Sequence, residues 1–177
     1  MAEYTEIVDL KVQSRIRARY DPEIASLQAL GFRHLAFCLE MLGPYSAVLQ
    51  FPVLLLTLLK KEVLVFRSPL RLALGNVVLV HSDPPSIALC MGMGVKVFTC
   101  FSDSTILISS TFRSHAVPGP NSVIVRNLPA QTTKEAWESH KKRVLEMKAQ
   151  GRVVANSSSF GDYVELSKRE EDLSQYL

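Results

Sequence analysis

The segment KVFTCFSDSTILISSTF, residues 96–112, decides how this chain folds. Two short apolar runs flank a polar knuckle, which is typical of a β-hairpin. A loop of two residues and a loop of four both pair Phe101 with Ile106, so we expect that register. Alternate side chains of the two strands then share one face of the hairpin: Val95, Val97, Thr99, Phe101, Ile106, Ile108, Ser110 and Phe112.

Asp103 lies at the tip of the expected hairpin. Its carboxylate could serve either a chemical reaction or the turn itself. At a turn, an aspartate side chain accepts hydrogen bonds from nearby backbone amides. We therefore interpret Asp103 as a turn residue rather than a catalytic one.

A helix is expected after the hairpin, from Thr132 to about Gln150. Thr132 and Glu135 have the spacing of a capping box, and Gly151 is a stop signal. The helical period predicts one buried stripe, formed by Trp137, His140, Val144 and Met147. It also predicts a solvent-exposed face, formed by Lys141, Lys142 and Lys148. We interpret His140 as a hydrogen-bonded core residue rather than a metal ligand.

Further strands are expected on both sides of the hairpin. Apolar runs bounded by turn residues predict them at 32–40, 63–66, 70–74, 77–80, 87–91 and 123–128. Gly75–Asn76 is expected to be a turn between two of these strands, and Asp83–Pro85 another.

A short helix is expected at 21–31, where Asp21 can cap the first amides and Pro22 suits the first helical position. The sum predicts an α+β fold. Its core is a mainly antiparallel meander of about six or seven strands, with this short N-terminal helix and a longer C-terminal helix packed on the sheet.

The 177 residues fit one ordinary domain. We divide the chain into an N-terminal basic arm or strand at 1–20, a single α+β core domain at 21–151, and a C-terminal extension at 152–177. The extension is expected to be mobile, because chain ends usually are unless they are tied down.

Residues 1–20 fit a helix or a strand, because an apolar residue recurs every fourth position from Val8 while residues 11–20 also alternate. Read as a strand, the second half puts four cations on one face: Lys11, Arg15, Arg17 and Arg19. That row could bind an anionic surface, since each cation contributes about 1 kcal/mol near an anionic bilayer. The simpler interpretation is a solvated face.

The most hydrophobic stretch is SAVLQFPVLLLTLL, residues 46–59. As a helix it would cover about 20 Å, which is short of the roughly 30 Å hydrocarbon core of a bilayer. Pro52 is expected to break it further. We predict that the stretch does not span a membrane, and we take as candidate interface residues Phe51, Leu54, Leu55 and Leu58.

Composition restricts the partners and the compartment. The net charge of +3 is too small to indicate nucleic-acid binding by itself. Three cysteines, Cys38, Cys90 and Cys100, are an odd number without CxxC spacing and favour a reducing compartment. The first residues have no apolar core typical of a secretory signal. We expect a cytoplasmic location or the cytosolic face of a membrane.

Reactive constellations are scarce in the sequence. The nearest nucleophilic set is His81, Asp83 and Cys90, and we interpret it as a strand end, a turn and a buried thiol. A zinc site assembled from Cys90, Cys100 and His115 is an alternative that only the fold could create. We predict no catalytic residue, no metal and no cofactor.

The hairpin also carries a resemblance. GVKVFTCFSDSTILISSTF, the Pro-rich loop after it and the WESH helix resemble uncharacterised bacterial proteins in which a Y-T-x-F-x-D-G-T-like hairpin precedes a Trp/His helix. The shared part covers roughly residues 92–150. Phe98 stands where that pattern has Tyr, and Ser104 replaces its turn glycine. The resemblance implies a shared fold and transfers no activity and no site residue.

Three functions remain open on these observations. We favour a non-enzymatic binding or adaptor domain whose partner is another protein or a second copy of the chain. One alternative is peripheral attachment to an anionic membrane through the 46–59 stretch and the row of Arg15, Arg17 and Arg19. The other is an enzyme with a Cys/His site assembled by the fold. The sequence does not favour nucleic acid as a partner.

Overall fold

The computed structural model describes residues 3–41, 64–68, 71–112, 124–127 and 129–174. The apolar stretch 46–59, with the candidate interface residues Phe51, Leu54, Leu55 and Leu58, lies outside these residues, and so does His115.

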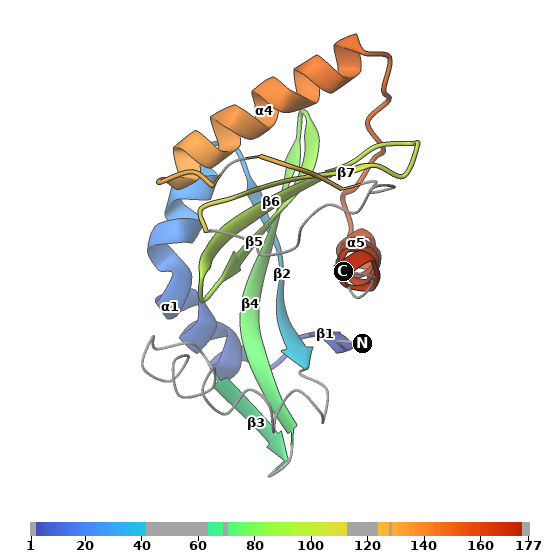
Figure 1. Cartoon of the computed structure of the whole chain (residues 1–177). Helices are drawn as coiled ribbons and strands as arrows, with labels where there is room; N and C mark the ends of the chain where they lie inside the picture. Colours follow the sequence, from blue (N-terminus) through green and yellow to red (C-terminus); the bar gives the residue numbers. More distant parts are fainter. Residues whose placement is uncertain (1–2, 42–63, 69–70, 113–123, 128, 175–177) are drawn as a thin grey trace.

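A twisted sheet forms the centre of the molecule (Figure 1). Its strands lie in the order β1-β2-β4-β5-β6-β7-β8, and β3 pairs with β4 beside this row. Neighbouring strands are antiparallel except for β7 and β8, which are parallel. The strands are β1 (Glu3–Glu6), β2 (Arg33–Met41), β3 (Leu64–Ser68), β4 (Arg71–Ser82), β5 (Pro85–Met91), β6 (Gly94–Cys100), β7 (Ile106–Ser110) and β8 (Ile124–Arg126).

Three helices accompany the sheet in the described part of the chain: α1 (Leu10–Ala29), α4 (Thr133–Ala149) and α5 (Phe160–Ser174). The predicted α+β fold, with a mainly antiparallel sheet and helices at both ends of the chain, is confirmed. The described residues form eight strands: β8 lies in the strand predicted at 123–128, β1 was not predicted, and the strands predicted at 70–74 and 77–80 are a single strand, β4.

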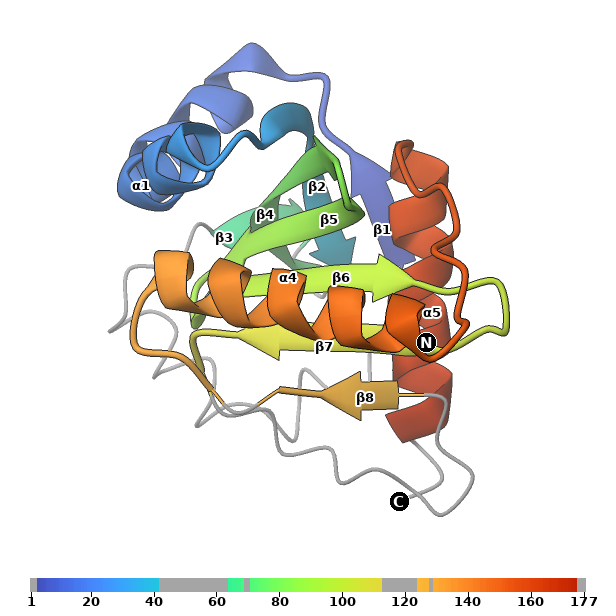
Figure 2. The same cartoon turned by 90° about the horizontal axis from the view of Figure 1, so that it is seen from above.

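The helices cover both faces of the sheet. α1 packs on β2, β4 and β5, while α4 packs on β6 and β7 of the same face. α5 lies on the opposite face, as the view from above shows (Figure 2). Because β4 and β5 are therefore buried on both sides, they carry continuous apolar runs, 77–80 and 87–90, rather than alternating ones.

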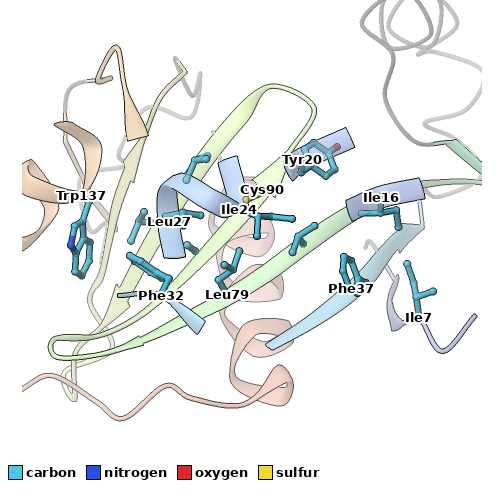
Figure 3. Close-up of a cluster of buried hydrophobic side chains, with 14 of the residues drawn as sticks. Ile7, Ile16, Tyr20, Ile24, Leu27, Phe32, Phe37, Leu79, Cys90 and Trp137 are labelled. Carbon is cyan, nitrogen blue, oxygen red and sulfur yellow. The ribbon is translucent and has the colours of Figure 1, made fainter. Parts of the chain in front are cut away.

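Alternate side chains of these central strands point to opposite faces of the sheet and pack in two separate hydrophobic cores. The α1-side core, drawn in Figure 3, extends from Trp137 near one end to Ile7 at the other and includes Val77, Leu79, Ala88, Cys90, Val95 and Val97. The α5-side core contains Val78, Val80, Ile87, Leu89, Phe98, Cys100, and the α5 residues Tyr163 and Leu166.

Residues 10–19 are helical, so of the two alternatives left open for this segment the helix is correct and the strand is not. Asp9 caps the helix by accepting hydrogen bonds from the backbone of Lys11 (2.8 Å) and Val12 (3.2 Å). Ile16 and Tyr20, four residues apart, are both buried against the sheet. The helical backbone is interrupted at Tyr20 and resumes towards Pro22, which confirms the helix predicted from residue 21.

The turn expected at Gly75–Asn76 is also wrong, because β4 runs straight through it. Gly75 lies opposite Leu39 and Asn76 opposite Cys38, both in β2. The Asn76 side chain donates to the Glu40 carboxylate at 3.1 Å. This hydrogen bond across the strands satisfies the buried amide of Asn76, so an asparagine, which the sequence pattern associates with turns, is accommodated inside a strand.

Both ends of the chain contribute to the packed body. Ile16 and Tyr20, from the predicted arm at 1–20, are buried in the α1-side core, and Tyr163 and Leu166, from the predicted extension at 152–177, are buried in the α5-side core. The three-part division and the mobility of the C-terminal end stay predictions, but the core extends beyond residues 21–151.

The hairpin formed by β6 and β7 has a register one residue away from the predicted one. Cys100, and not Phe101, pairs with Ile106. Phe101 instead donates its amide to the Thr105 carbonyl at 2.8 Å, and Ser104 adopts a left-handed conformation with φ 70°. This three-residue loop, with one residue in the left-handed region, was not among the two loop lengths considered. A one-residue slip exchanges the faces of a strand, so Thr99 shares its face with Leu107 and Ser109.

Candidate functional site

The hairpin register places two hydroxyls beside the buried histidine of α4. His140 is completely buried. Its Nε2 atom lies 2.8 Å from the hydroxyl oxygen of Thr99 in β6, and its Nδ1 atom lies 2.8 Å from that of Ser109 in β7. Both ring nitrogens are therefore hydrogen-bonded, which confirms the interpretation of His140 as a hydrogen-bonded core residue.

The hydrogen bonds continue in both directions from His140. Beyond Ser109, the Asn127 side-chain amide donates to the Ser109 hydroxyl at 2.8 Å. Beyond Thr99, the Ser86 hydroxyl lies 2.8 Å from the Thr99 hydroxyl and donates to the Pro84 carbonyl at 3.0 Å. We call this set, from the Pro84 carbonyl to Asn127, the His140 chain.

Counting protons fixes the direction of the His140 chain. A hydroxyl has one proton to donate, a neutral imidazole has one, and the terminal carbonyl has none. The Thr99 hydroxyl also makes a longer contact with the Pro85 carbonyl, at 3.4 Å, which uses the same proton. One proton for each of the five shorter contacts is obtained only if every group donates towards Pro84. Ser109 then donates to Nδ1 of His140, and Nε2 of His140 donates to Thr99. The structure thus assigns the Nε2–H tautomer to His140.

Burial keeps this histidine neutral. Loss of hydration lowers the pKa of His140 from its ordinary value of 6.5 to about 3. The Trp137 ring stacks beside the imidazole, with 5.9 Å between ring centroids and 20° between planes. A proton on Nδ1 would take away the acceptor of the Ser109 hydroxyl proton, so the chain itself also opposes the charged form.

The Ser109–His140 contact has the distance of a nucleophile and its base, but its surroundings favour a structural role. Ser109 is 1% exposed, and its proton is held by an imidazole of low basicity. Sequence reasoning identified His140 and missed Thr99, Ser109 and Ser86. The sequence signal that could have found them is the presence of three hydroxyl residues inside apolar strands, in a chain with one histidine that was predicted to be buried.

The set of His81, Asp83 and Cys90 does not come together. His81 lies opposite Ser86 in the strand pairing and Cys90 lies opposite Val77, four residues away. At about 3.3 Å per residue this is roughly 13 Å along the strand. The His81 Nδ1 atom accepts the backbone amide of Asp83 at 3.1 Å, so the pair forms a turn, as interpreted from the sequence.

The cysteines are separated, and two of them, Cys38 and Cys90, are unreactive in character. Burial raises the pKa of Cys38 to about 12 and that of Cys90 to about 12. Cys90 faces the α1-side core, whereas Cys100 faces the α5-side core, so the sheet lies between two of the three ligands of the alternative zinc site. Across the residues with described positions, no group of three His, Cys, Asp or Glu side chains could hold a metal ion.

Asp103 stabilises the hairpin tip, as interpreted from the sequence. One carboxylate oxygen accepts the Thr105 amide at 3.0 Å, and the other lies 2.7 Å from the Arg152 guanidinium. The Thr105 amide is the largest of several contacts that lower the pKa of Asp103. Arg152 also donates to the Thr105 hydroxyl, and Arg169 donates to the Ser104 carbonyl at 2.7 Å. The tip is therefore fastened to the segment that follows α4 and to α5.

The four cations predicted to share one face of a strand lie on a helix, which places them on different sides of its surface. Lys11, Arg15 and Arg17 are exposed, while Arg19 is half-buried with its guanidinium 5.6 Å from the centroid of the Tyr20 ring. Lys11, Arg15 and Arg19 are four residues apart and follow one side of α1, and Arg17 lies on the other side of its exposed surface. Arg17 is close enough to His34 to contribute, after burial, to the lowered pKa of that histidine. Binding of an anionic partner by these residues stays a prediction.

Tyr163 places a hydroxyl in the α5-side core without a well-formed hydrogen bond, although the Ser167 side chain and the Cys38 thiol lie near it. The residue is 1% exposed, and its oxygen has no partner at hydrogen-bond geometry in the part of the chain described. Burial is the main cause that raises the pKa of this phenol, the nearby Cys38 thiol raises it further, and the Ser167 side chain opposes the shift. We expect Tyr163→Phe to raise the free energy of unfolding by about 1 kcal/mol, because it removes a buried group that lost its hydration without compensation.

Urea unfolding of the purified protein measures this effect. The matched control is Tyr4→Phe, which changes the half-buried tyrosine that meets Tyr163 edge-on at 5.7 Å between centroids. If Tyr163→Phe lowers stability by 1 kcal/mol or more, the hydroxyl has a partner and the description of this core is incorrect.

In comparisons with known proteins, no protein-family model, no curated protein and no solved structure matches the chain. The resemblance of residues 92–150 to bacterial proteins with a similar hairpin stays a prediction. Among the described helices, none combines the length and the apolar character that crossing a bilayer requires.

Proposed function

We propose that this protein is a non-enzymatic binding domain that acts through a protein partner. The observation that carries the proposal is the pair of aliphatic side chains at the start of α1. Val8 is 89% exposed and Leu10 is 74% exposed, although only Asp9 separates them in the chain. Neighbouring exposed apolar side chains with charged residues around them are typical of interaction surfaces.

The side chains with reactive potential support the same proposal. His140 uses both ring nitrogens inside the core, Asp103 is engaged by the hairpin and Arg152, and the thiols of Cys38 and Cys90 are buried with raised pKa values. Each of these groups has a structural explanation that leaves it unsuited to attack a substrate. A cytoplasmic location fits the three free cysteines and stays part of the proposal.

Site-specific photocrosslinking tests the proposal. A benzophenone amino acid replaces Leu10 in the full chain, and a second version carries it at Lys142, which is exposed on α4. We expect position 10, and not position 142, to give one defined adduct in cells, identified by mass spectrometry. An adduct with a second copy of the chain would identify the domain as a homo-oligomer.

Other exposed apolar positions complete the test. Met93, Leu145 and Val153 are 55%, 64% and 63% exposed and lie elsewhere on the surface. If neither these positions nor position 10 give a defined adduct, the binding function is wrong.

A further inference from the structure

The exposed side of the first half of α1 carries unbalanced positive charge. Residues 10–19, LKVQSRIRAR, contain four cations and no acid. Among the described residues, no carboxylate lies within ion-pair distance of Lys11, Arg15 or Arg17. Several cations elsewhere have such partners: Lys96, Arg126, Lys141, Arg143 and Arg152.

Helix geometry places Leu10 between these cations. At about 100° per residue, Ile16 and Tyr20 define the buried side of α1, and Leu10 lies on the exposed surface, with Arg17 in nearly the same direction but two turns, roughly 10 Å, further along the helix. Lys11 and Arg15, four residues apart, flank Leu10 on its other side. Val8 lies just before the first turn. We call these five residues the α1 surface: Val8, Leu10, Lys11, Arg15 and Arg17.

We infer that the α1 surface binds an acidic protein segment that also presents an apolar side chain. This inference rests on the proposed function and names the chemistry of the partner. The apolar side chain of the partner covers Leu10 and Val8, and its carboxylates pair with the surrounding cations. Arginine suits this role, because its planar guanidinium binds a carboxylate through two parallel hydrogen bonds.

The composition of the α1 surface favours a protein over a membrane. A bilayer would meet the whole α1 surface at once, including the exposed Glu6 and Asp9, whereas a protein segment can place its carboxylates beside the cations and away from these two acids. The apolar face of α1 is not free to enter lipid, because Ile16 and Tyr20 are buried in the α1-side core. Nucleic acid would satisfy the cations, but two aliphatic side chains offer its bases no aromatic ring for stacking.

A designed peptide tests the inference directly. The probe is a fluorescein-labelled helical peptide with leucine at every third or fourth position and glutamate elsewhere, and fluorescence anisotropy measures its binding to the full chain. Two matched peptides replace every leucine by serine or every glutamate by glutamine. We expect both to bind at least about tenfold more weakly than the probe, because binding requires both the apolar contact and the pairing of carboxylates with the cations.

Variants of the protein locate the binding. We expect Lys11→Glu with Arg15→Glu, and separately Val8→Ser with Leu10→Ser, to weaken binding of the probe by about tenfold or more. The matched control is Lys142→Glu with Lys148→Glu, which makes the same charge change on the solvent-exposed surface of α4. We expect the control to change binding less than about twofold. Circular dichroism verifies that each variant is folded.

Several outcomes would overturn the inference. The first is no binding of the probe at about 1 mM protein, and the second is an equal loss in the α4 control, which would indicate non-specific attraction to net charge. The third is tighter binding to phosphatidylserine vesicles or to a single-stranded oligonucleotide than to the probe. Crosslinks from Met93, Leu145 or Val153, with none from position 10, would leave the binding function standing and remove only this inference.

Discussion

Lowering the pH from about 6.5 to 4 is expected to remove about 3 kcal/mol of folding free energy through His140 alone. In the folded protein the pKa of His140 is about 3, whereas the ordinary value is 6.5. Below pH 6.5 the His140 side chain binds a proton in the unfolded chain but not in the folded chain, so the unfolded state is increasingly favoured. The loss continues until the pH reaches the folded-state pKa and then stops.

Urea unfolding at a series of pH values measures this dependence. The comparison variant is His140→Leu, in which the midpoint should be lower at neutral pH but should depend much less on pH between 6.5 and 4. The control is His34→Gln, because the pKa of the exposed His34 is also lowered and its contribution has the same sign. The pKa values of Asp103 and Asp162 are lowered from 3.8, so their stabilising effects are lost mainly below this window.

A wild-type protein as stable at pH 4 as at pH 7 would contradict the neutral, buried state of His140. So would a His140→Leu variant that retains the full pH dependence of the wild type.

Trp137→Ala is expected to lower the free energy of unfolding by about 3–5 kcal/mol, since it empties the largest buried side-chain volume of α4. Trp137 is 1% exposed. Its ring lies 4.8 Å from that of Phe32 and 4.7 Å from that of His81, measured between centroids, so the cavity would open where α4 meets the sheet and the start of β2.

Leu145→Ala is the matched control for this substitution. Leu145 is in the same helix and is 64% exposed, so its truncation should change stability by less than about 0.5 kcal/mol. Equal losses from Trp137→Ala and Leu145→Ala in urea unfolding would show that α4 does not pack as described.

The sequence was sufficient to predict α4 and its buried stripe. The capping box of Thr132 and Glu135 is present in both directions, and a left-handed Gly151 follows the helix end. The predicted stripe is buried throughout: Trp137, His140, Val144 and Met147. These predictions hold because helix caps and the 3.6-residue period are local properties of the chain.

The partners of His140 could not be predicted, because they depend on one residue of strand register. Both possible registers put apolar side chains on both faces of the hairpin, so hydrophobicity did not distinguish them. The choice depends on the three-residue loop and on Ser104, a non-glycine residue in a left-handed conformation. The correct register is the one that gives Thr99 and Ser109 a common partner in His140.

The packing of α5 on the second face of the sheet was missed, and the choice between helix and strand for residues 10–19 stayed open, for a similar reason. Nothing local in the last residues predicts that Tyr163 and Leu166 pack on the sheet, since this contact joins distant parts of the chain. Alternation over residues 11–20 fitted a strand as well as a helix, and burial of Ile16 and Tyr20 on the sheet decides for the helix.

The account depends most on His140 being a neutral structural residue whose hydrogen bonds join α4 to β6 and β7. Long-range proton–nitrogen NMR spectra of the imidazole at about pH 5, roughly 1.5 units below the ordinary histidine pKa, test this directly. We predict a neutral ring with the proton on Nε2 and an unprotonated Nδ1. A ring protonated on both nitrogens, or a neutral ring protonated on Nδ1, would contradict the account.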